Sequence, residues 1–82
     1  MTTKVSAGGT IELEGACAIE DAEVLQRELL AHPSAAVDWR ACRAAHTAVV
    51  QVLLASRRRV IGPPANAFLR AHVEPLLSAS AD

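Results

Sequence analysis

Residues 37–55 read VDWRACRAAHTAVVQVLLA and carry the clearest local signal of architecture in the chain. Residues 35–39 are short and largely apolar, which predicts a buried strand. From about Thr47 to Ser56 the chain is too evenly apolar for a surface helix, although Thr47 and Gln51 fall at helical spacing. We expect a helix here that is packed on several sides, with a strand as the alternative because of its β-branched valines.

Two strands and a helix are expected before this stretch. Residues 4–7 form a short first strand, and residues 10–14 alternate apolar and acidic side chains, as in a strand with one solvated face. Gly8-Gly9 between them suits a two-residue hairpin turn. A helix should run from Asp21, whose carboxylate can cap the first turn, to about His32. The inner face of this helix would carry Ala22, Leu25 and Leu29.

A minimal strand and a last helix are expected after it. Val60-Ile61 is the strand, and Gly62-Pro63-Pro64 stops it. Asn66 should cap the helix, and Pro75 should bend or end it. We expect the tail 78–82 to fray. The inner face of this last helix would carry Phe68, Leu69, Val73 and Leu76.

The order of these elements predicts an α/β fold. The spacing between strands leaves room for crossover helices, so we expect a mixed, mostly parallel sheet of roughly three to four strands, with about three helices on one face. Glu12 and Glu14 indicate that the other face is partly exposed, which favours two layers over three. The length of 82 residues leaves room for a single domain spanning residues 1–82.

Composition excludes several classes of function. With 51% hydrophobic and 21% charged residues and a formal charge of -1, the chain is typical of a small globular domain, not of a disordered or nucleic-acid-coating protein. Trp39 and Phe68 are the only aromatic residues, which disfavours binding of single-stranded nucleic acid by base stacking. The sequence has no membrane-spanning run and no signal peptide, so we expect a cytoplasmic protein without membrane insertion. It also lacks phosphate loops, catalytic motifs and metal-ligand spacings, so we expect no enzyme activity, cofactor or metal.

Some reactive or charged residues have a plain structural interpretation. Cys17 and Cys42 are too few for a disulfide framework and are expected to be buried thiols; a redox pair is the alternative, and it requires that they be adjacent in the fold. The arginines at 57–59 are expected to interact with a helix C-terminus, although a phosphate or membrane contact is the alternative. His32 and His72 are expected to be solvated helix residues.

The stretch from Val37 to Ala55 resembles the STAS domain, the fold shared by bacterial anti-sigma factor antagonists and the cytoplasmic ends of sulfate transporters. In that family a strand ending near an aspartate runs into a loop with a hydroxyl residue, followed by an apolar helix. Asp38 matches the strand-end acid, and Thr47 matches the hydroxyl residue. Residues 50–54 match the helix start, and residues 51–55 are similar to the QLLLA run of short STAS proteins. A looser match of pattern covers residues 10–77.

Two positions depart from the family pattern. His46 stands where the family has an aspartate, and Val49 stands where it has a glycine. In family members with one hydroxyl in the loop, the phosphorylated position maps to Thr47. In members with two serines it maps to Ala48, which cannot be phosphorylated. A plain helix cap is the alternative role for Thr47.

The resemblance implies a non-catalytic regulatory module that binds another protein. Its partner-binding residues would be Asp38, His46, Thr47, Ala48 and Val49, and phosphorylation of Thr47 would release the complex. The partner would be an anti-sigma factor kinase or a chemosensory component. The alternatives are a constitutive subunit bracing the ATPase of a bacterial lipid-transport complex, and a thiol redox sensor using Cys17 and Cys42. The chain is shorter than typical STAS domains, so we expect an exposed sheet edge and either a homodimer or dependence on a partner.

Overall fold

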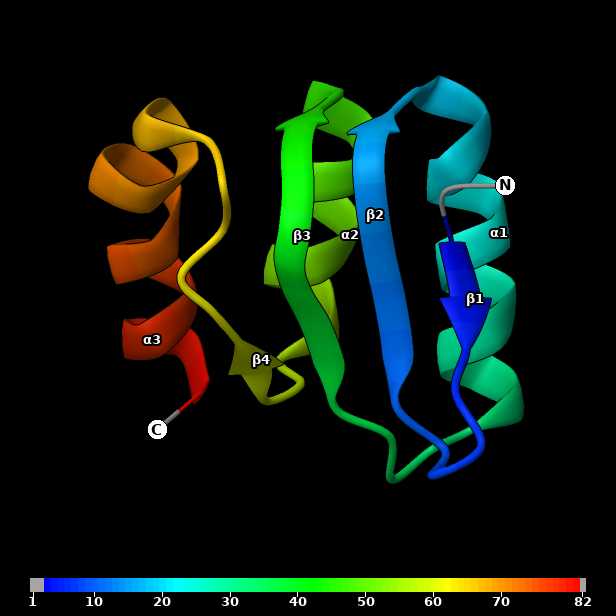
Figure 1. Ribbon diagram of the computed structural model, residues 1–82. Coiled ribbons are helices and arrows are strands. Elements are labelled where there is room, and N and C mark those ends of the chain that lie inside the picture. The colour runs from blue at the N-terminus through cyan, green and yellow to red at the C-terminus, as the bar shows by residue number, and fades with distance from the viewer. Residues whose placement is uncertain (1–2, 82) are drawn as a thin grey trace.

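A four-stranded mixed sheet in the order β1-β2-β3-β4 forms one layer of the protein, and helices form the other (Figure 1). The computed structural model describes residues 3–81, and the side chains of residues 3–77. β1 pairs antiparallel with β2, whereas β2 with β3 and β3 with β4 pair parallel. The predicted α/β class and two-layer architecture are therefore confirmed. In chain order, the elements are β1 (Thr3–Val5), β2 (Ile11–Cys17), α1 (Ile19–Ala31), β3 (Val37–Ala45), α2 (Thr47–Ser56), β4 (Val60–Ile61), the π-helical turn η1 (Leu69–Val73) and α3 (Glu74–Ala81).

The N-terminal hairpin has a longer turn than expected. β1 ends at Val5 and β2 begins at Ile11, so the loop is formed by residues 6–10. The Ser6 backbone N–H donates to the Thr10 carbonyl at 2.8 Å, and Gly9 has a φ of 84° that favours glycine. The expectation of a two-residue Gly8-Gly9 turn was wrong because the chain closes through this wider loop.

The start of α1 is fixed by Asp21, but from inside the helix. The N-cap residue is Ala18, and Asp21 is the third helical residue. Its carboxylate accepts a hydrogen bond from the Ala18 backbone N–H at 2.8 Å and another from the Thr3 hydroxyl at 3.0 Å. The expected N-cap position of Asp21 was therefore wrong by one helical turn, because the carboxylate reaches back to the cap instead of standing at it. The predicted inner face of Ala22, Leu25 and Leu29 is confirmed as buried.

β3 is longer than the sequence indicates. A strand was expected at residues 35–39 followed by a loop, but β3 continues to Ala45 and α2 follows after one residue. The pairing with β2 shifts twice, between Glu12 and Glu14 and between Gly15 and Ala16. Each shift leaves one extra residue on β3, so its buried side chains are Val37, Trp39 and Cys42. These bulges break the alternation with period two, which is why the strand is hidden in the sequence.

The last helical segment buries a different face from the one predicted. Asn66 does act at its start, because its side-chain oxygen accepts from the Leu69 backbone N–H at 3.1 Å. The buried residues are Leu69, Val73 and Leu77, whereas Phe68 and Leu76 are exposed, so the expected placement of these two in the core was wrong. The regular α-helical hydrogen bonding is interrupted just before Pro75 by the wider turn η1, but Pro75 does not end the helix, since α3 continues to Ala81. The expected fraying concerns residues 78–82, whose side chains lie outside the described residues.

One core fills the space between the layers. α1 and α2 cover the same face of the sheet, and α3 packs against α2 beside β4 (Figure 1). The opposite face is solvated, as Glu12 and Glu14 indicated, and the Lys4 ammonium lies between their carboxylates. β4 pairs with only the first two residues of β3. Further along that edge, Ala65 donates its backbone N–H to Cys42, and the Asn66 amide donates to the Arg43 carbonyl, so the loop covers part of the expected open edge.

Candidate functional site

The first turn of α2 stands at the carboxyl end of β3, attached directly to the sheet. His46 is the single residue between the two elements, in an extended conformation. Its backbone N–H donates to the Cys17 carbonyl at 2.9 Å, which ties the start of α2 to the end of β2. Its Nδ1 accepts from the Ala48 backbone N–H at 3.0 Å, so the imidazole caps the helix. The alternative role of Thr47 as the helix cap was wrong, because the N-cap residue is His46.

Thr47 is the first residue of α2 and its side chain is exposed. Within the described residues its hydroxyl makes no hydrogen bond. The hydroxyl is therefore neither part of the core nor needed for capping. It is held at a fixed place on the surface because the helix beneath it is anchored to two strands.

The predicted partner-binding residues do not all share this surface. His46 and Thr47 are exposed and Ala48 is half-buried. Val49 is fully buried, so its expected contact with a partner was wrong. The reason is helical geometry: Val49 and Leu53 lie four residues apart and both face the core.

Asp38 lies at the other end of the sheet. It is the second residue of β3, so roughly 20 Å of extended strand separates it from the start of α2. Its expected position at the carboxyl end of a strand, next to Thr47, was therefore wrong. Asp38 accepts from the Arg40 guanidinium at 2.7 Å, and this contact holds the pKa of the Asp38 carboxyl below its ordinary range.

An apolar cleft of about 400 Å³ lies on one side of Thr47. Val50 and Thr47 line it from α2, and Phe68 and Val73 line it from the last helical segment. The Phe68 side chain is 65% exposed, and its ring centroid lies 5.0 Å from that of His72. Sequence reasoning assigned Phe68 to the core. Leu69, Val73 and Leu77 recur every four residues and so define the buried face of this segment, and Phe68 does not fall on that face.

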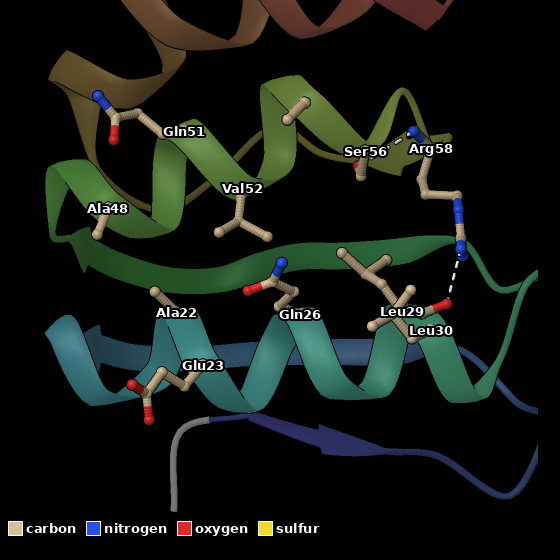
Figure 2. A pocket seen from close by; sticks show the side chains of 11 residues that line it. Ala22, Glu23, Gln26, Leu29, Leu30, Ala48, Gln51, Val52, Ser56 and Arg58 are labelled. Atoms are coloured by element: carbon tan, nitrogen blue, oxygen red, sulfur yellow. Dashed lines mark hydrogen bonds between the residues drawn. The ribbon is translucent and has the colours of Figure 1, made fainter.

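A second hollow of about 480 Å³ lies on the other side, between α1 and α2 (Figure 2). Figure 2 shows Ala48 and Val52 of α2 facing Ala22 and Gln26 of α1 across it. The far end of this groove is closed by Arg58, whose guanidinium donates to the Leu29 carbonyl at 2.7 Å. Two surface depressions therefore flank the first turn of α2. Thr47 lines only the first of them, which we call the Phe68 cleft.

The three arginines at positions 57–59 have different surroundings. Arg58 donates to the carbonyls of Leu29, His32 and Ala35, where α1 ends. A helix C-terminus was the expected partner, but it is that of α1 and not that of the helix that precedes the triplet. Arg57 and Arg59 are exposed. His32 is half-buried at the end of α1, 3.8 Å from the Glu28 carboxylate, and His72 is exposed.

The two cysteines are neighbours beneath this end of the sheet. Both are buried, and their Sγ atoms lie 3.9 Å apart. Contact with the Cys17 thiol lowers the pKa of the Cys42 thiol, and burial, which raises the pKa, offsets part of that shift. The adjacency that a redox pair requires is therefore present. No group of three His, Cys, Asp or Glu side chains within the described residues is arranged to hold a metal ion.

Comparisons of the chain with models of known protein families, with curated proteins and with solved structures give no match. Among residues 3–81, no helix is long and apolar enough to cross a lipid bilayer.

Proposed function

We propose that this protein is a non-catalytic, cytoplasmic regulatory module that docks onto a partner protein through the first turn of α2, in the manner of a STAS-like anti-sigma factor antagonist. The observation that carries the proposal is the exposed Thr47 hydroxyl, which has no other role in the described residues and stands at the rim of the Phe68 cleft. By resemblance, the partner is an anti-sigma factor kinase or a chemosensory component.

Thr47 suits phosphorylation because a phosphate there is tolerated by the fold. A helix N-terminus is the positive end of the helix dipole, which favours negative charge. Thr47 is the first residue of α2, so its phosphate would lie within that field. A phosphate adds about 1.5 to 2 negative charges at neutral pH, and the module should remain folded with it.

The same phosphate would oppose docking. The cleft beside Thr47 is lined by Val50, Phe68 and Val73, which offer a partner mostly apolar surface. Burying a phosphate against such a surface costs free energy because its charge loses water without gaining a partner. One modification can thus leave the module intact and weaken the complex.

The test begins with the partner captured from native cells by the tagged protein, whose affinity is then measured by calorimetry with purified components. We expect Thr47→Ala to bind like the wild type and Thr47→Glu to bind at least about tenfold more weakly, which corresponds to about 1.4 kcal/mol. Thr10→Glu is the matched charge control, because Thr10 lies before β2 at the opposite end of the sheet. Equal affinities of Thr47→Ala and Thr47→Glu would overturn the switch.

A second pair of variants tests which depression holds the partner. Phe68→Ala should weaken binding, since it removes the exposed aromatic ring of the Phe68 cleft. Leu30→Ala removes an exposed apolar side chain from the groove between α1 and α2 and should leave binding unchanged. A loss with Leu30→Ala alone would move the docking surface to the groove of Figure 2.

A further inference from the structure

Cys17 and Cys42 form a close thiol pair in the core. Cys17 is the last residue of β2, and Cys42 lies on β3 opposite Gly15, so the two are diagonal neighbours on adjacent parallel strands. Both side chains face the helical layer, and their Sγ atoms are 3.9 Å apart. We infer that this pair is a redox modification site: peroxide converts it to an intramolecular disulfide that alters the attachment of α2 to the sheet.

Closing the bond requires the two Sγ atoms, now 3.9 Å apart, to approach to about 2.05 Å, and a local movement of β2 toward β3 can supply that approach. The movement has a natural place, because the pairing of β2 with β3 shifts between Gly15 and Ala16. Gly15 has a φ of 67°, and Arg43 is left without a partner in the register at this bulge. A bond made by drawing strands together is strained and easily reduced, which suits a reversible modification.

The chemistry balances with hydrogen peroxide as the oxidant. The thiolate of Cys42 attacks one peroxide oxygen, the S–O bond forms, the O–O bond breaks, and the departing hydroxide takes a proton to become water. The Cys17 sulfur then attacks the sulfenic sulfur of Cys42; the S–S bond forms, and the second hydroxide leaves with the Cys17 proton as water. Two thiols are oxidised by two electrons in total, and one peroxide is reduced to two waters. Because both thiols are buried, the peroxide enters when this end of the sheet opens locally.

The backbone carbonyls of the same two cysteines accept hydrogen bonds from the two segments that flank the Phe68 cleft. The Cys17 carbonyl accepts from the His46 N–H at 2.9 Å, where α2 begins. The Cys42 carbonyl accepts from the Ala65 N–H at 3.0 Å, in the loop before the last helical segment. A shift of either cysteine backbone therefore changes a hydrogen bond that positions one wall of the Phe68 cleft. The disulfide would alter the shape of that cleft.

The experiment treats the reduced protein with hydrogen peroxide and follows the product by mass spectrometry. We expect the intact mass to fall by two hydrogens, and trypsin to release the peptide Ala41–Arg43 linked to the peptide that contains Cys17. Dithiothreitol should restore the starting mass. Hydrogen exchange at the His46 and Ala65 amides should become faster in the oxidised protein, with the Ile11 amide at the other end of the sheet as the internal control.

Two variants make the result specific. Cys17→Ala and Cys42→Ala each keep one thiol, and neither should lose two hydrogens or give the linked peptide. An unchanged wild-type mass, or a disulfide only between two chains, would overturn the modification site, and unchanged exchange at both amides would overturn its link to α2. None of these measurements uses a partner or Thr47, so their failure is distinguishable from failure of the docking proposal.

Discussion

At the scale of single residues, His46 is the side chain on which the candidate site depends. Its imidazole accepts the Ala48 N–H and so caps the first turn of α2. Only Nδ1 without a proton can accept, so a charged imidazole would lose the cap and would also face the positive end of the helix dipole. Asp, Asn and Ser are stronger caps than most side chains, and they carry no such condition.

We therefore expect His46→Asp to stabilise the protein by about 0.5 to 1 kcal/mol at neutral pH, and His46→Ala to destabilise it by about 0.5 to 2 kcal/mol. The measurement is the free energy of unfolding from urea titration. Thr47→Ala is the matched control and should change stability by less than about 0.5 kcal/mol, because the hydroxyl does not cap α2. If Thr47→Ala cost as much as His46→Ala, the assignment of the cap would be wrong.

At the scale of elements, the two helices that cover the sheet are joined by Arg58. The residue follows α2 in the chain, yet its guanidinium binds the last carbonyls of α1. Those carbonyls have no partner within the helix, so a charged donor stabilises them more than a neutral one would. The contact also closes one end of the groove between α1 and α2 (Figure 2). A residue that looks like part of a basic patch in the sequence thus fixes the packing of two helices.

Arg58→Ala should lower the free energy of unfolding by about 2 to 3 kcal/mol, because three carbonyls lose a charged donor in a half-buried place. Arg58→Lys should recover only part of the loss, since an ammonium lacks the planar fork of the guanidinium. Arg59→Ala is the control at an exposed neighbour and should stay within about 0.5 kcal/mol of the wild type. Equal losses at both arginines would show that charge, not the contact with α1, is responsible.

At the scale of the whole molecule, a single core joins both layers. Trp39 of β3 is fully buried in it, and buried residues of α1, α2 and the last helical segment belong to the same cluster. A chain of this size buries only about 60% of the surface that its unfolded form exposes. Neither layer could therefore keep its structure after the other is lost.

Unfolding should accordingly be a single cooperative transition. We expect the urea midpoint from Trp39 fluorescence, which reports the core, to coincide with that from far-ultraviolet circular dichroism, which reports the helices. Because Trp39 is the only tryptophan, its signal needs no correction for a second site. Two separate midpoints would mean that the helices and the sheet are independent units, contrary to the shared core.

The type and order of the elements, and the α/β class, were predicted correctly because they depend on local properties. Periods of hydrophobicity distinguish strands from helices, and Gly8-Gly9 and residues 62–64 separate elements. The site was predicted only in part. Thr47 and His46 are exposed at the first turn of α2, but Val49 is buried and Asp38 lies at the opposite end of β3.

By itself the sequence determined the type and order of the elements, because the preference of a segment for strand or helix depends on residues close together in the chain. Tertiary structure alone decided the two bulges in β3, the exposure of Phe68, the reach of Arg58 to α1 and the contact of Cys17 with Cys42. Each of these depends on groups distant along the chain. These contacts stabilise the protein only once the layers have packed. They therefore cannot be predicted from a local sequence pattern.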